Sequence, residues 1–364
     1  MKDGRVIVVS AINIVDGGMR TILDESINHF RKIENEYKIV YLVSQDVADS
    51  YQGIEGIEFV SFPLSRRSWL FRLYYEYIGF KRWQLSAGYV NVFLWLSLHD
   101  TTPNVFASRQ AVYCHNAVVF LKLNIRHIFL APRLYIVSLL YKYIYRLGIR
   151  KNKKVIVQQH WFGDFFQSYT NRNCILVARP HFDLSRGNFH AKAVKSDSFF
   201  YPAFPRVFKN HMTLVNAFKS VPKSTLDLTL SGNENRISQA IQKFCAKNTC
   251  ENVRFLGRLS RDETLSRLAG CKALIFPSTL ESWGLPISEA VALEKTVLLP
   301  DLPYAREAAG DYCNVYWFDP YLTESIVDAV GRYESGASPD GATGYVKKYD
   351  EVITWDEILQ ELVS

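Results

Sequence analysis

The sequence predicts an α/β protein with two doubly wound parallel-sheet domains. The first observation is a regular alternation of short apolar strands with helical stretches, which is the pattern of parallel sheets. The second is that this alternation loosens in a polar stretch at residues 183–197 and then starts again. The third is the length of 364 residues, which suits two or three domains and, with 48% hydrophobic residues, excludes a disordered chain.

The first domain, residues 1–182, opens with a buried strand at 6–10, a glycine turn, a helix at 19–33 and a second strand at 38–43. This order is a βαβ unit. Further strands are predicted at 58–60, 90–96, 111–114 and 154–158. The N-terminus lacks the apolar length and the cleavage site of a signal peptide, so we expect a cytoplasmic protein.

The second domain, residues 198–345, follows a linker at 183–197 and repeats the alternation. Strands are predicted at 198–201, 226–231, 253–256, 273–277 and 296–299, and helices at 213–219, 236–247, 262–270, 286–293 and 305–309. Residues 346–364, which include Trp355, are predicted to form a closing helix. In such a pair of domains, the default binding site is a cleft between them.

The formal charge of +7 is unevenly distributed. Residues 121–154 contain nine basic and no acidic residues, and residues 64–83 contain five basic and one acidic residue among many aromatics. This mixture suits an anionic membrane surface, although a solvated helix face is the simpler alternative. No recognition module accompanies the charge, so we expect no nucleic-acid partner. The longest uncharged run, 83–98, is shorter than the roughly 20 residues of a membrane span, so no transmembrane helix is predicted.

The densest functional signature lies in residues 276–290. A predicted strand ends at Pro277, and the loop after it carries Glu281. Gly284 permits close approach of a backbone, and Pro286 fits the first turn of a helix. The unpaired amides at such a helix start favour a phosphate, and Glu289 one turn later can accept hydrogen bonds from a ribose. Taken singly, Glu289 would more often be a solvated helix carboxylate, and Glu281 a surface charge in a loop.

The spacing Glu281-x7-Glu289, with Gly284-Leu285-Pro286 between the glutamates, resembles the Glu-x7-Glu motif of the retaining GT-B glycosyltransferases of family 4, the bacterial O-antigen and capsule type of group 1. Residues 253–257, 273–278 and 288–290 look similar to the same group. The resemblance implies two Rossmann-like domains facing a cleft, of which residues 1–182 bind the acceptor and residues 198–345 bind the nucleotide sugar. It also implies a closing helix that crosses back to the first domain and a UDP-, GDP- or dTDP-sugar donor. It places Glu289 on the ribose and Glu281 on the donor sugar. The other donor-binding candidates are Gly17, Gly18, Gly232, Arg258, Leu259, Ser282, Gly284 and Leu285.

The same resemblance implies that Arg206 and Lys209 neutralise the departing diphosphate. In the family the arginine usually lies five residues before the lysine, where this chain has Phe204. His115 ends a predicted strand, which is where the family has a histidine beside the transferred sugar; a core histidine is the alternative. The catalytic candidates are therefore His115, Arg206, Lys209 and Glu281, and the candidates for acceptor contact are His99, Asp100 and Arg109.

The function implied is transfer of a hexose or deoxyhexose to a lipid-linked saccharide, on the inner face of the plasma membrane, during synthesis of O-antigen or capsule. No Asp-x-Asp motif occurs in the chain, so no metal is expected. We expect no other cofactor either. A non-catalytic sugar- or lipid-binding scaffold is one alternative. A nicotinamide-dependent enzyme is another, but the turn at residues 16–19 lacks the Gly-x-Gly-x-x-Gly pattern that it needs.

Overall fold

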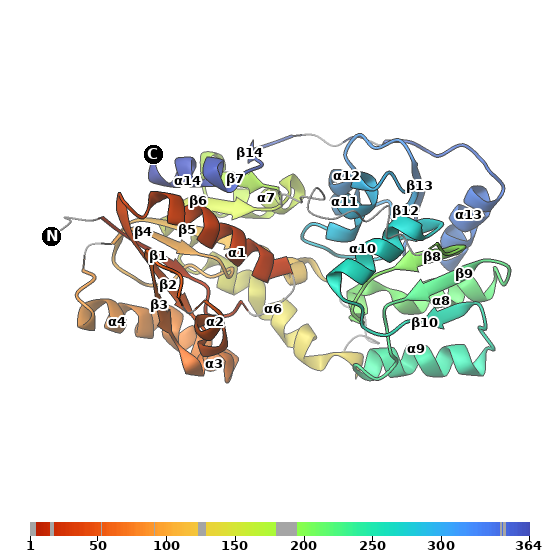
Figure 1. The fold of residues 1–364 in the computed structure, drawn as a ribbon, viewed down its shortest axis with the longest axis horizontal. Coiled ribbons are helices and arrows are strands. Elements are labelled where there is room, and N and C mark those ends of the chain that lie inside the picture. Colours follow the sequence, from red (N-terminus) through yellow and green to blue (C-terminus); the bar gives the residue numbers. More distant parts are fainter. Residues whose placement is uncertain are drawn as a thin grey trace. The chain divides into compact units, whose positions relative to one another are not determined.

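The computed structural model describes residues 5–14, 18–51, 53–90, 92–122, 129–179, 195–342, 344 and 347–364. Two compact units emerge from the contacts within the chain. The first contains residues 1–116, 140–181 and 347–364, and the second contains residues 117–139 and 182–346. Among the described residues, each unit holds one parallel sheet with helices around it (Figure 1), which confirms the predicted fold class.

The sheet of the first unit has eight strands in the described residues, in the order β14-β7-β6-β5-β4-β1-β2-β3. Every neighbouring pair is parallel. The strands are β1 (Arg5–Ser10), β2 (Tyr37–Val43), β3 (Ile57–Ser61), β4 (Val92–Ser97), β5 (Ala107–Cys114), β6 (Asn152–Val157), β7 (Ile175–Ala178) and β14 (Asp350–Val352). The central strands are buried on both faces, which explains their nearly continuous apolar sequence.

Helices pack on both faces of this sheet. They are α1 (Gly18–Phe30), α2 (Gln45–Ser50), α3 (Trp69–Tyr74), α4 (Phe80–Ser86), α6 (Pro132–Arg146), α7 (His160–Gln167) and α14 (Trp355–Val363). On one face, α14 buries Trp355 and Ile358 in the same cluster as Leu23 of α1, and the Trp355 indole donates a hydrogen bond to Glu25 at 3.0 Å. On the other face, Phe80 of α4 packs against Trp95. The predicted closing helix thus covers the first sheet.

The sheet of the second unit has six parallel strands in the described residues, in the order β10-β9-β8-β11-β12-β13. The strands are β8 (Ser198–Tyr201), β9 (Thr225–Leu228), β10 (Val253–Phe255), β11 (Ala273–Ile275), β12 (Val297–Pro300) and β13 (Val315–Phe318). The helices are α8 (His211–Lys219), α9 (Arg236–Lys247), α10 (Arg261–Gly270), α11 (Leu285–Ala292), α12 (Pro303–Ala309) and α13 (Thr323–Glu334). The strand order reverses between β8 and β11, and open parallel sheets bind ligands at the carboxyl side of such a reversal.

Gly17 lies outside the described residues, and the linker predicted at 183–197 is described only from residue 195. None of the described helices is long and apolar enough to cross a bilayer.

Candidate functional site

Two loops meet at the carboxyl ends of β8 and β11 in the second unit. The Thr279 amide donates a hydrogen bond to the Phe208 carbonyl at 2.7 Å, and the Asn210 side chain donates one to the Pro277 carbonyl at 3.2 Å. Asn210 adopts a positive φ of 57°, which asparagine tolerates better than most residues. These bonds hold the loop that carries Lys209 against the loop that leads to Glu281.

Lys209 and Glu281 form an ion pair in this place, with 2.5 Å between Nζ and Oε1. Their side chains are 17% and 13% exposed, so the pair is shielded but still accessible. The Tyr201 hydroxyl donates to the Lys209 carbonyl at 2.7 Å and fixes the lysine backbone. Because an ammonium group has three donors, Lys209 retains donor capacity for an anion beside Glu281. Arg206 lies on the same loop, is exposed, and has its guanidinium carbon 6.0 Å from the centre of the Phe208 ring.

Glu289 is buried in α11, with 1% of its surface exposed. Its carboxylate accepts a hydrogen bond from Arg261 at the start of α10. Burial raises the pKa of Glu289, and the charge of Arg261 offsets only part of this rise. Arg258 is exposed and Leu259 is half-buried, and both lie just before α10.

The start of α11 depends on Gly284. This residue has a φ of 91°, and a Cβ added there would lie 3.2 Å from the Ile287 side chain, so a larger residue would strain the turn. Glycine has no side chain with which to cap the helix, and Leu285 begins the helix directly after it. Such uncapped first amides suit an anion. The preceding loop contains half-buried Ser282 and is closed by a hydrogen bond from the Trp283 indole to the Ser288 hydroxyl at 2.9 Å.

A third loop, after β9, contains Gly232 with a φ of 90°. A Cβ at this position would meet only the flexible end of the Gln242 side chain, at 2.7 Å, so the positive φ is the main reason for glycine here. The amides of Ser231 and Gly232 donate to the Glu234 carboxylate, the second at 3.1 Å. Burial alone would raise the pKa of Glu234, but these backbone hydrogen bonds outweigh it and the pKa is lowered.

In the first unit, Asp100 lies just beyond the carboxyl end of β4, with a φ of 72° and 4% exposure. Its Oδ1 accepts hydrogen bonds from the amides of His115 at 2.8 Å and Asn116 at 3.0 Å, and from the Tyr145 hydroxyl at 2.9 Å. Its Oδ2 accepts one from the Tyr141 hydroxyl at 3.1 Å. This carboxylate therefore fixes the residues that follow β5.

Buried charges surround Asp100. His99 Nδ1 lies 3.0 Å from Glu76 Oε1, both side chains are fully buried, and Arg72 donates to the His99 carbonyl. Burial would raise the pKa of Asp100, but the charges of His115 and Arg72 and the hydrogen bonds outweigh it, so the pKa is lowered. These internal partners give His99 and Asp100 a structural role, which does not require an acceptor.

His115 differs from these residues because its side chain reaches the surface, with 10% exposed. Its Nε2 lies 3.5 Å from Asp100 Oδ2. Burial lowers the pKa of His115 more than Asp100 raises it, so the imidazole is neutral near pH 7. Its Nδ1 is buried and has no hydrogen-bond partner in the part of the chain that is described. A bound molecule could therefore contact only the small exposed part of this neutral ring, and not Nδ1.

The remaining first-domain candidates lie apart from His115. Arg109 donates hydrogen bonds to the carbonyls of Leu362, Val363 and Ser364, so it caps the last turn of α14. It lies near the amino end of β5, and the structure explains it as a cap. Gly18 is the first residue of α1.

Sequence reasoning missed several residues that complete these groups. Arg261 and Asn210 hold the second-unit loops, and Tyr141 and Tyr145 bind Asp100. The two tyrosines are four residues apart in α6, so they share one helix face. That spacing is a signal in the sequence, whereas Arg261 and Asn210 gave none.

Comparisons with known proteins place the second unit in a family. Residues 188–342 match the family model described as glycosyl transferases group 1. Among curated proteins, the chain is similar to the O-antigen chain mannosyltransferase RfbU of Salmonella typhimurium, with 21% identity over 227 residues. This alignment covers 61% of the chain and 63% of the relative, a little less than two thirds of that protein's length.

Solved structures resemble the chain over most of its length. Sucrose-phosphate synthase from Thermosynechococcus elongatus has a TM-score of 0.69 at 13% identity, covering 91% of this chain and 90% of that one. HepE from Anabaena, solved in complex with UDP-glucose, has a TM-score of 0.59 at 14% identity, with the same coverage of 91% and 90%. At such identities the likeness shows the fold, which is GT-B. Residues 188–342 therefore carry a glycosyl transferases group 1 domain, in a chain whose fold is GT-B.

Proposed function

We propose that the chain is a retaining glycosyltransferase of family 4 that moves a hexose or deoxyhexose from a nucleoside-diphosphate sugar to a lipid-linked saccharide. The observation that carries the proposal is the grouping of an accessible Lys209–Glu281 pair with a buried Glu289 carboxylate inside a group 1 domain. The likeness to an O-antigen chain mannosyltransferase supports a role in bacterial surface polysaccharide.

In this proposal, different residues of the second unit contact different parts of the nucleotide-sugar donor. Glu289 accepts hydrogen bonds from the ribose, and Glu281 binds hydroxyls of the transferred sugar. The amides of Gly284, just before α11, and of Leu285, its first residue, contact the diphosphate together with Lys209 and Arg206. The base lies near Arg258 and Leu259. Each charged hydrogen bond contributes about 1.5–3 kcal/mol to donor binding.

The reaction breaks the bond between the anomeric carbon and the diphosphate oxygen and forms one from that carbon to the acceptor oxygen on the same face. The acceptor proton passes to a phosphate oxygen of the leaving group, so no side chain acts as a base. Lys209 and Arg206 stabilise the charge that develops on the diphosphate, without a metal ion. His115 contacts the transferred sugar from the first unit.

The test of this proposal begins with thermal shift measurements against UDP-, GDP- and dTDP-sugars, followed by a transfer assay with the donor that binds. Glu281→Ala is expected to abolish transfer while it leaves the affinity for the nucleotide nearly intact. Glu324→Ala, at an exposed position in the first turn of α13, is the matched control. A protein that binds no nucleotide sugar would overturn the proposal, and one that binds but never turns over would be a sugar-binding scaffold.

We also propose that the chain rests on the cytoplasmic face of an anionic membrane through residues 64–83 and 121–154. Helix α6 supports this proposal, because Ile136, Leu139, Leu140 and Tyr143 are exposed on a helix that also carries Arg133, Lys142 and Arg146. Leu70 of α3 is also exposed. Exposed apolar and basic residues on one helix are typical of interfacial binding. Residues 123–128 of the second segment lie outside the described ranges.

Liposome flotation tests the membrane contact directly. We expect flotation with vesicles that contain anionic lipid and much less with neutral vesicles, because each cation near the surface contributes roughly 1 kcal/mol. The double variant Leu139→Ser, Leu140→Ser should float less, whereas the same exchange at exposed Leu322 of the second unit should not matter. Equal flotation of both variants, or indifference to lipid charge, would remove the proposal.

A further inference from the structure

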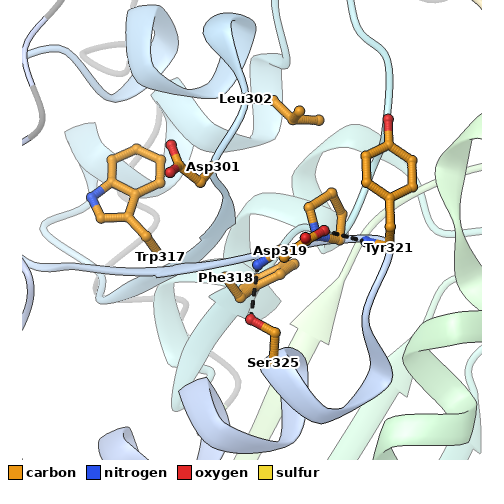
Figure 2. A pocket seen from close by; sticks show the side chains of 8 residues that line it. Asp301, Leu302, Trp317, Phe318, Asp319, Tyr321 and Ser325 are labelled. Atoms are coloured by element: carbon orange, nitrogen blue, oxygen red, sulfur yellow. Dashed lines mark hydrogen bonds between the residues drawn. The ribbon is translucent and has the colours of Figure 1, made fainter.

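A separate hollow opens at the carboxyl ends of β12 and β13, with a volume of about 350 Å³ (Figure 2). That volume is in the range of small-molecule sites. Asp301 follows β12, Trp317 belongs to β13, and Asp319 and Tyr321 follow β13. None of these four residues has a role in the donor site proposed above.

Two aromatic rings border the hollow. Trp317 and Tyr321 lie on opposite sides of it in Figure 2. The Trp317 indole donates a hydrogen bond to the Gly341 carbonyl at 2.9 Å, so this ring is held in place before any ligand arrives. Tyr321 is 49% exposed and has the Lys122 ammonium 5.3 Å from its ring centre. The fixed Trp317 ring offers an apolar face at little entropic cost, and Tyr321 adds a second, exposed ring.

Two oriented carboxylates complete the lining. Asp301 Oδ1 accepts a hydrogen bond from Arg306 Nε at 2.6 Å, and Asp319 Oδ1 accepts one from the Tyr321 amide at 2.8 Å. Within the described ranges, no hydrogen bond to Oδ2 of either aspartate occurs, and both residues are exposed. A hydrogen bond to one oxygen therefore orients each carboxylate, and its other oxygen can accept a hydrogen bond from a hydroxyl group.

Hydrogen bonds from one side chain join the hollow to the loops that carry Lys209 and Glu281. The Asn210 side chain donates hydrogen bonds to the Pro320 carbonyl at 2.7 Å and to the Pro277 carbonyl at 3.2 Å. Pro320 lines the hollow, and Pro277 precedes the loop of Glu281. One side chain, next to Lys209 in the sequence, therefore holds both places together.

The chemistry of the lining selects a class of ligand. None of the lining residues is basic, and two carry negative charge. Arg306, which pairs with Asp301, and Lys122, beside Tyr321, offset that charge but do not line the hollow, so the lining offers a diphosphate no cation. Apolar ring faces match the C–H face of a pyranose, and aimed carboxylates match its hydroxyls through charge-assisted hydrogen bonds. We propose that this hollow binds a neutral pyranose of the acceptor saccharide, outside the nucleotide site. The assignment of that pyranose to the acceptor rests on the glycosyl transfer proposed above.

Saturation-transfer difference NMR with methyl α-D-mannopyranoside and methyl α-D-glucopyranoside tests the proposal. We expect ring-proton signals from one or both glycosides with the unmodified protein. Tyr321→Ala and Asp319→Asn should each lower these signals about fivefold, as the loss of about 1 kcal/mol of binding does. Phe106→Ala, which removes an exposed aromatic ring of the first unit, is the matched control and should leave the signals unchanged. Signals that persist in both hollow variants would overturn the proposal.

Competition separates the possible occupants of the hollow. A mixture of UDP, GDP and dTDP should leave the glycoside signals unchanged, whereas their loss would place the glycoside in the donor site and overturn the proposal. Signals that survive the nucleotides but vanish with UDP-glucose or GDP-mannose would assign the hollow to the donor sugar and overturn the acceptor assignment. A protein that binds no nucleotide but still binds glycoside in a Tyr321-dependent way would refute the transferase proposal alone.

Discussion

The two units each bury a carboxylate near the carboxyl edge of the sheet but leave it in opposite electrostatic states. Asp100 in the first unit is 4% exposed and its pKa is lowered, whereas Glu289 in the second is 1% exposed and its pKa is raised. Depth of burial therefore does not decide the sign of the shift. The partners decide it, because donors and positive charges stabilise the ionised form that burial disfavours.

The hydrogen-bond partners also show which of the two carboxylates can still bind a ligand. Asp100 receives hydrogen bonds from two backbone amides and two tyrosine hydroxyls. Donors of the protein itself therefore occupy both oxygens of the Asp100 carboxylate. Glu289 has one side-chain partner in the described part of the chain, Arg261, which is itself half exposed. A carboxylate that is buried and only partly satisfied is suited to accept hydroxyl donors from a bound molecule.

We expect the largest difference between the two carboxylates in the stability of variants that replace them. Asp100→Asn should lower the free energy of unfolding by about 3 kcal/mol, because an oxygen that accepts buried hydrogen bonds is replaced by an amide donor. Buried Arg72 also loses a nearby carboxylate and keeps that of Glu76. Glu289→Gln should cost less than about 1 kcal/mol, since it removes a charge that burial already disfavours. Urea unfolding followed by circular dichroism measures both. Equal losses in the two variants would refute the contrast.

The second prediction concerns the affinity of the protein for the nucleotide-sugar donor. Glu289→Gln should weaken binding of the nucleotide sugar about 10- to 100-fold, which corresponds to loss of a charged hydrogen bond of roughly 1.5–3 kcal/mol. Titration calorimetry with the donor found by thermal shift gives the number. Glu324→Gln, at an exposed position on α13, is the control that should leave the affinity unchanged. Unchanged affinity in Glu289→Gln would remove Glu289 from the donor site.

The pH dependence of stability should have opposite signs in the two units. The pKa of Asp100 is lowered from 3.8, so its contribution is complete above pH 3.8 and is lost as the pH falls through the folded-state pKa. The pKa of Glu289 is raised from 4.5, so the unmodified protein should gain stability over Glu289→Gln as the pH falls from that raised value toward 4.5. Unfolding curves of each variant, paired with the unmodified protein across pH 3–7, measure both trends.

The smallest effect is expected at Arg261. Arg261→Ala should raise the pKa of Glu289 further and weaken donor binding about two- to fivefold near neutral pH, as loss of a half-exposed ion pair does. Arg261→Lys should restore most of the affinity, because a positive charge is retained. The pH profile of donor affinity distinguishes this role, since loss of Arg261 should move the acid limb of the profile upward. An unmoved profile would contradict it.

Much of the fold could be predicted because the signals are local. The helix predicted at 236–247 has the same bounds in the structure, where Asn235 caps it and Ser238 completes the capping box. Strands β7, β13 and β14 were not predicted. Strands β7 and β14 pair with each other although about 170 residues separate them, and only the folded chain brings such short segments together. The predicted strand at 226–231 is shorter in the structure because β9 ends at Leu228.

The residues of the candidate site also fall into those that a local sequence pattern predicts and those that it does not. Glu281, Gly284 and Glu289 lie in one short stretch, so their spacing alone predicts a shared role. Asn210 and Arg261 act through contacts with that stretch from other loops, and no local pattern marks them. The burial of Asp100 could not be predicted either, since it depends on tyrosines from α6 that pack beneath it.

The return of the chain to its first sheet has a consequence for biosynthesis. Strand β14 adds to β7, and α14 covers the apolar face beside α1, yet both are translated after the whole second unit. While the ribosome is still reading residues 198–345, the edge of the first sheet and the Trp355 contact surface have no cover. The later unit can therefore complete its core first, and the nascent earlier unit is the one more exposed to aggregation and to chaperones.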